Sequence, residues 1–68
     1  MKKSVANNVY LLRNKQGLTQ EDFAQKVGVS RQTIIAIEKG NYTPSVLLAL
    51  KIADIFKRPV EDIFHLTQ

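Results

Sequence analysis

The fold of this chain is decided by one stretch, which reads Leu18-Thr19-Gln20-Glu21-Asp22-Phe23-Ala24-Gln25-Lys26-Val27-Gly28-Val29-Ser30-Arg31-Gln32-Thr33-Ile34. It holds two short helical patterns that are separated only by Gly28 and Val29. Thr19 can cap the first helix, and Asp22, three residues later, can reach back to it, as in a capping box. Ser30 is a good N-cap for the second helix. Because glycine lets the backbone turn sharply, we expect the two helices to cross steeply at this joint.

The second helix of the pair is predicted to have two unlike faces. Ile34 and Ile37 recur at a helical spacing and would point inward, and Gly40 is a typical helix stop. The side chains that would point outward have few apolar atoms between them; they are Arg31, Gln32, Thr33 and Ala36.

A further helix is expected before the pair. Val5, Val9 and Leu12 recur there at steps of three and four residues, which is the spacing of one helix face. Gly17 suits the end of this helix.

Two more helices are expected after the pair. One runs from about 45–57, and a short last one from about 60–64. No segment alternates cleanly with a period of two, so we expect no sheet, and a short strand at 65–68 stays open. The sequence therefore predicts an all-α, compact five-helix domain formed by residues 1–68.

The composition excludes several functional classes. Of the 68 residues, 44% are hydrophobic and 24% charged, which suits a folded domain rather than a disordered one. There is no Cys, so a disulfide is excluded, and zinc could use only carboxylates and the single His65. The sequence shows neither a Gly-rich phosphate loop nor paired catalytic carboxylates. We expect no enzyme, no metal, no cofactor and no small-molecule ligand.

The distribution of apolar and charged residues bears on location and partners. No apolar run approaches the roughly 18 residues that span a membrane, and no apolar signal-peptide core follows the basic start. We therefore expect a cytoplasmic protein with no membrane partner. Residues 1–34 carry six basic and two acidic side chains, whereas residues 35–68 carry four of each. This asymmetry fits a polyanionic partner and, equally, a role in solubility.

The opening stretch resembles the helix-turn-helix of the phage-repressor and Cro group, also called the xenobiotic-response-element (XRE) family. Two later segments fit the same pattern, namely Ile37-Glu38-Lys39-Gly40 and Pro44-Ser45. The resemblance covers roughly Val9 to Phe64. It implies a lambda-repressor-like fold that binds operator DNA, usually as a dimer.

The resemblance also implies which side chains meet double-stranded DNA. Base contacts would come from the outward face of the recognition helix, that is, from Arg31, Gln32, Thr33 and Ala36. Arginine can fork onto guanine, glutamine can pair with adenine, and methyl groups can touch the methyl of thymine. Contacts to the DNA backbone are expected from Gln20, Ser30, Lys39, Asn41 and Tyr42. Gln20 would also brace the recognition helix. Ser30 also serves as a cap, and Tyr42 is aromatic where the family often has a basic residue.

A structural ion pair is implied between Arg13 and Glu38. Arg13 falls on or beside the apolar stripe of the first helix, and Glu38 follows Ile37. The pair would orient the recognition helix against the first helix and add little net stability. We expect the removal of Glu38 to cost several times what a change of an exposed charge costs.

The helix expected over about 45–57 is apolar nearly all round, which is typical of a helix that is fully buried or shared with a partner. We expect a two-fold homodimer through Leu48, Ile52, Ile55, Ile63, Phe64 and Leu66. For Ile52 and Ile63, a place in the core is an equal alternative. A two-fold dimer would set the recognition helices about 34 Å apart and would require a palindromic operator.

The sequence thus predicts sequence-specific binding of double-stranded DNA that regulates transcription, most simply by repression. The alternative is a protein-interaction module, such as the antitoxin of a toxin–antitoxin pair that also binds its own operator.

Overall fold

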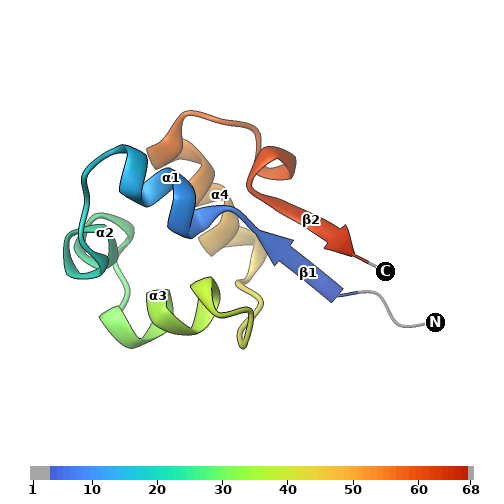
Figure 1. The fold of residues 1–68 in the computed structure, drawn as a ribbon, viewed down its shortest axis with the longest axis horizontal. Helices are drawn as coiled ribbons and strands as arrows, with labels where there is room; N and C mark the ends of the chain where they lie inside the picture. Colours follow the sequence, from blue (N-terminus) through green and yellow to red (C-terminus); the bar gives the residue numbers. More distant parts are fainter. Residues whose placement is uncertain (1–3, 68) are drawn as a thin grey trace.

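The computed structural model describes residues 4–67. Along the chain these residues form a short strand, four α-helices, a single 3-10 turn and a second strand (Figure 1). Their bounds are β1 (Ser4–Asn7), α1 (Val9–Lys15), α2 (Gln20–Val27), α3 (Arg31–Glu38), α4 (Val46–Phe56), η1 (Val60–Asp62) and β2 (Phe64–Thr67).

Hydroxyl side chains set the starts of three helices. The Thr19 hydroxyl accepts the backbone N–H of Asp22 at 3.0 Å, and the Asp22 carboxylate accepts the backbone N–H of Thr19 at 3.3 Å. This reciprocal pair is the predicted capping box of α2. Ser30 and Ser45 cap α3 and α4 in the simpler one-bond form.

The joint between α2 and α3 depends on Gly28. Its φ of 87° is left-handed, a conformation that residues with a Cβ rarely adopt. The backbone N–H groups of Gly28 and Val29 both donate to the carbonyl of Ala24, at 2.8 and 3.0 Å. The chain therefore leaves α2 and enters α3 within two residues, as the sequence predicts.

The core lies between the helices and is closed by η1. Its largest fully buried side chains come from every part of the described chain; they are Phe23, Ile34, Ile37, Ile52, Ile63 and Val9. The rings of Phe23 on α2 and Phe56 on α4 stack with their centroids 5.0 Å apart. α3 thus packs on a core to which α2 and α4 both contribute.

The prediction that the chain has no sheet is wrong. β1 and β2 pair antiparallel, from Ser4 opposite Thr67 to Asn7 opposite Phe64 (Figure 1). Each strand has four residues, which is too short for a period-two pattern to stand out, and the pairing joins opposite ends of the sequence. Val5 therefore lies in β1 rather than on the first helix, which begins at Val9.

The fifth predicted helix is only a 3-10 turn. η1 covers Val60–Asp62, and the chain is already extended at Phe64, where β2 begins. Ile63 between them is fully buried. The prediction of an all-α domain is therefore correct from α1 to α4 and wrong at the two ends of the described chain, where β1 and β2 form.

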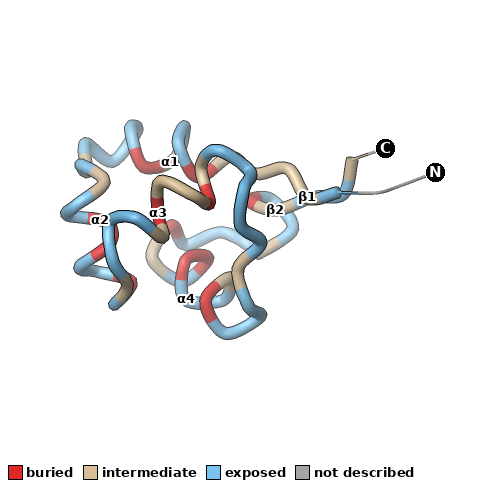
Figure 2. Tube along the Cα trace, turned by 90° about the horizontal axis from the view of Figure 1, so that it is seen from below, coloured by how far each residue is buried: buried red, intermediate tan, exposed pale blue. Residues whose placement is uncertain are grey.

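Part of the predicted dimer interface lies inside the protein instead. Ile52 and Ile63 are fully buried and Leu48 is 8% exposed, because one side of α4 packs on the core. Figure 2 shows buried and exposed positions alternating along α4. Ile55 and Phe64 are half-buried against the same core, and Leu66 is exposed. The exposed apolar residues of α4 are others, namely Val46, Leu47 and Leu50.

The two sides of α4 should respond differently to truncation. We expect Ile52→Ala to lower the free energy of unfolding by about 2–5 kcal/mol, because it removes buried methyl groups and leaves a cavity. Lys51→Ala, at an exposed position of α4, should change it by less than about 0.5 kcal/mol. Urea unfolding at low micromolar protein measures both values. Equal losses in the two variants would contradict the assignment of Ile52 to the core.

Candidate nucleic-acid interface

The outward face of α3 is the candidate reading surface. Arg31 and Gln32 are exposed at the start of the helix, and Thr33 and Ala36 are half-buried one turn on. Ile34 and Ile37 hold the opposite side of the helix in the core. The four side chains predicted to touch bases thus lie on one helix, outside its buried face.

The start of α3 is stabilised by Ser30. Its hydroxyl accepts the backbone N–H of Thr33 at 3.2 Å and lies 3.1 Å from the Thr33 hydroxyl. Ser30 is therefore the N-cap of this helix, and it is also exposed beside the reading surface.

The end of α3 turns sharply at Gly40, whose φ is 78°. The Gly40 N–H donates to the carbonyl of Ile37 at 3.0 Å, and the Asn41 N–H donates to the carbonyl of Ala36 at 2.9 Å. These two bonds are those of a Schellman motif. The turn leaves Lys39, Asn41 and Tyr42 exposed just beyond the helix.

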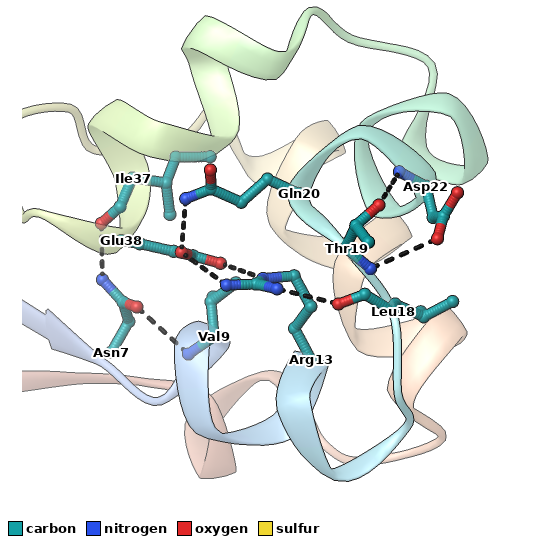
Figure 3. A network of polar contacts seen from close by, with 9 residues as sticks. All are labelled: Asn7, Val9, Arg13, Leu18, Thr19, Gln20, Asp22, Ile37 and Glu38. Carbon is teal, nitrogen blue, oxygen red and sulfur yellow. Dashed lines mark hydrogen bonds and ion pairs between the residues drawn. The ribbon is translucent and has the colours of Figure 1, made fainter.

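A buried polar network holds α3 against the first two helices (Figure 3). The Nε of Arg13 donates to Oε2 of Glu38 at 2.7 Å, and its Nη2 donates to Oε1 at 3.3 Å. The side chains of this ion pair are only 7% and 5% exposed. The remaining Nη1 of Arg13 donates to the carbonyl of Leu18 at 2.8 Å, which fixes the chain just before α2.

Gln20 completes this network. Its Nε2 donates to Oε1 of Glu38 at 3.1 Å, so the carboxylate accepts from both α1 and α2 (Figure 3). Among the described residues, every buried side-chain nitrogen and oxygen has a hydrogen-bond partner. The family resemblance implies both the Arg13–Glu38 pair and a bracing role for Gln20, and the hydrogen bond to Glu38 is the contact through which Gln20 braces α3.

An open concavity lies beside the first turn of α2 and the first residue of α3. Its volume is about 450 Å³, and it is lined by Arg13, Thr19, Gln20, Glu21 and Arg31. Since Arg31 also belongs to the reading surface, the concavity adjoins that surface. Its lining carries two guanidinium groups, one of them paired with Glu38, and one carboxylate.

Asn7 is a residue of this region that the sequence does not reveal. Its side-chain amide donates to the carbonyl of Ile37, at the end of α3. The signal is absent from the sequence because the contact depends on β1, which forms only by pairing with the far end of the chain.

The described residues contain neither a cluster of metal ligands nor a membrane-spanning helix. Residues 4–67 bring together no group of three or more His, Cys, Asp or Glu side chains able to hold a metal ion. In the same range, every helix is too short or too polar to cross a membrane.

Comparison with known proteins connects this geometry to a family. Residues 9–63 match the family described as helix-turn-helix. An HTH-type transcriptional regulator of Methanocaldococcus jannaschii is 60% identical over 85% of this chain and 88% of its own length. The HTH-type transcriptional regulator YgzD of Bacillus subtilis is 52% identical, over 91% of this chain and 94% of its own. The phage CTXphi transcriptional repressor RstR of Vibrio cholerae is 33% identical, over 76% of this chain and 47% of its own.

Solved structures share the same architecture. A protein of Bacteroides fragilis superposes with a TM-score of 0.79 over 90% of this chain and 98% of that one, at 18% identity. The restriction-modification controller protein C.AhdI of Aeromonas hydrophila superposes with a TM-score of 0.73 over 79% and 82%, at 28% identity. The fold is therefore the helix-turn-helix fold expected from the sequence, with a two-stranded sheet in addition.

Neutralising Glu38 should destabilise the protein far more than neutralising an exposed carboxylate. Glu38→Gln leaves the buried guanidinium of Arg13 without a counter-charge, and breaking a buried pair in this way costs about 3–5 kcal/mol. Glu61→Gln, on an exposed residue of η1, removes the same charge and should cost less than about 0.5 kcal/mol. Thermal unfolding followed by circular dichroism compares the two. An unchanged melting temperature in Glu38→Gln would refute the role given to the pair.

Proposed function

Because this chain belongs to the helix-turn-helix family, we propose that it binds a palindromic operator in double-stranded DNA as a homodimer and represses transcription. Its relatives are named transcriptional regulators, proteins that act by binding DNA and not as enzymes. The name of one relative, RstR, specifies a repressor. Since the partner would be chromosomal DNA, we propose a cytoplasmic location and treat residues 1–68 as one DNA-binding unit.

The observation that carries the proposal is the polar face of α3, whose end is bonded to α1 and α2. An α-helix fits the major groove of B-DNA, where each base pair presents its own pattern of donors and acceptors. In our proposal Arg31 forks onto guanine and Gln32 pairs with adenine. Thr33 and Ala36 would lie against thymine methyl groups. The Ser30 cap stabilises the first turn of α3, and the bonds of Glu38 hold the end of the helix in place.

Residues on either side of this face would contact the phosphates. Gln20 borders the concavity between α2 and α3, and Ser30 lies at the start of α3. Beyond its end, Lys39, Asn41 and Tyr42 are exposed. Phosphate contacts fix register without reading sequence, and the net charge of +4 favours them.

The second copy would pack on the first two turns of α4. Val46, Leu47 and Leu50 are 76%, 66% and 53% exposed, and they fall within one arc of the helix, away from its buried side. An apolar patch of this kind marks an interaction site. Of the residues expected at the interface from the sequence, only Leu66 is exposed, at 67%, and the half-buried Ile55 and Phe64 would contribute only edges. The two-fold axis would set the two α3 helices about 34 Å apart.

Selection of bound sequences from a random duplex pool, repeated at two salt concentrations, tests the reading of bases. We expect a palindromic consensus for the natural chain and its loss in Arg31→Ala/Gln32→Ala, because that variant lacks the side chains that reach guanine and adenine. Lys26→Ala, at the far end of α2, should keep the consensus. Binding without any consensus in the natural chain would leave only a basic protein that adheres to polyanions.

Sedimentation equilibrium at tens of micromolar protein tests the interface. Leu47→Glu/Leu50→Lys keeps the net charge and should convert a dimer into a monomer, because it places charges in the apolar patch. Leu11→Gln, which alters a similarly exposed leucine on α1, should leave the dimer intact. A natural chain that sediments as a monomer would overturn the interface while leaving DNA binding open to the selection experiment.

A further inference from the structure

The side chain of Asn7 links the start of α1, two residues later in the chain, to the distant end of α3 (Figure 3). Asn7 is the last residue of β1 and pairs with Phe64 of β2. Its Oδ1 accepts the backbone N–H of Val9 at 3.1 Å, and its Nδ2 donates to the carbonyl of Ile37 at 2.9 Å. One half-buried amide thus contacts both the start of α1 and the end of α3.

Only a carboxamide fits between these two groups. The Val9 N–H needs an acceptor, the Ile37 carbonyl takes a second donor besides the Gly40 N–H, and Asn7 supplies one of each. If the nitrogen and oxygen of this amide exchanged places, the NH₂ group would face the Val9 N–H, and the oxygen would face the Ile37 carbonyl. A carboxylate in its place would satisfy Val9 and repel the carbonyl.

At α1, this amide does what the N-cap residue does not. Asn8 occupies the N-cap position and makes no side-chain hydrogen bond to the helix. The first N–H groups of a helix have no partner within the helix, and that of Val9 is bonded by Asn7. The side-chain amide of Asn8 donates instead to the backbone carbonyl of Asp62, the last residue of η1.

At α3, the amide binds next to the buried ion pair. The carbonyl of Ile37 also accepts the N–H of Gly40, so both of its lone pairs are used. Glu38, the next residue, is bonded by Arg13 and Gln20. The end of α3 is therefore held through its backbone from β1 and through a side chain from α1 and α2.

We infer that Asn7 is a positioning residue for DNA recognition: it ties the end of α3 to the terminal sheet and so sets the tilt of the recognition helix. Packing through Ile34 and Ile37 keeps α3 on the core but permits small rotations. Hydrogen bonds to base edges tolerate misplacement of only about 0.5 Å or 10–20°. This inference rests on the proposed function, since a tilt matters only to a helix that reads bases.

The test compares Asn7→Asp with Asn8→Asp, neighbouring substitutions that change the net charge equally. The first variant keeps an acceptor for Val9 and loses the donor to Ile37, whereas the second leaves both bonds of Asn7 intact. On the operator selected by the natural chain, we expect Asn7→Asp to bind about three- to tenfold more weakly than Asn8→Asp, the equivalent of one net hydrogen bond. On random DNA of the same length the two variants should bind alike, with equal salt dependence, because no phosphate contact differs.

A second measurement needs no DNA. In ¹H–¹⁵N spectra of the free protein, Asn7→Asp should shift the amide signals of residues 34–39, and Asn8→Asp should not. Thermal unfolding establishes that both variants are folded at the assay temperature. Equal operator affinity for the two variants, or α3 signals that do not move, would overturn the role of Asn7. If the natural chain selects no DNA sequence, the proposed function fails, and the spectra alone then decide whether Asn7 positions α3.

Discussion

The carboxylate of Glu38 is the group on which the orientation of α3 depends. It lies at the end of this helix, almost without solvent contact, and it accepts hydrogen bonds from Arg13 and Gln20. A buried charge is tolerated only when its partners are in place, so few positions of α3 satisfy it. Apolar contacts are less selective, because isoleucine side chains pack acceptably over a range of small shifts. The ion pair thus adds geometric definition more than stability.

The same network also fixes the chain segment that precedes α2. Arg13 also bonds the carbonyl of Leu18, and the next residue, Thr19, caps α2. The two helices of the motif are therefore fixed to α1 at the start of one and at the end of the other. Between these two points, Gly28 adopts the left-handed backbone conformation that turns the chain from α2 into α3. α3 is thus held at its end by polar bonds and along its inner side by Ile34 and Ile37, while its reading residues face outward.

The parts of the fold that depend on neighbours in sequence could be predicted from the sequence. The caps at Thr19 and Ser30, the turn at Gly28 and the buried stripe of α3 all follow from residues within one or two turns. The Arg13–Glu38 pair was implied by the family resemblance and is present in the structure. The sheet and the role of Asn7 could not be predicted, because both need β1 and β2 to meet across the whole sequence.

The exposure of α4 was also beyond the sequence. Its apolar residues nearly encircle the helix, and periodicity alone does not say which arc faces the core. The burial of Ile52 and Ile63 follows from the way η1 folds back on α4. The sequence therefore correctly indicated that α4 has more apolar surface than the core covers. Only the structure shows that the uncovered residues are Val46, Leu47 and Leu50.

The sheet has a consequence for how the domain opens. Only four residue pairs join the two strands, and the residues that adjoin them, Val9 and Ile63, are already fixed in the core, so the sheet can separate without opening the core. The contacts between α2 and α3 are short-range, so they form early and persist. Local unfolding is therefore expected to start with the sheet, whose amides exchange with solvent first. α2 and α3 can stay folded while β1 and β2 separate. The domain therefore has a stable helical centre and a terminal sheet that opens independently of it.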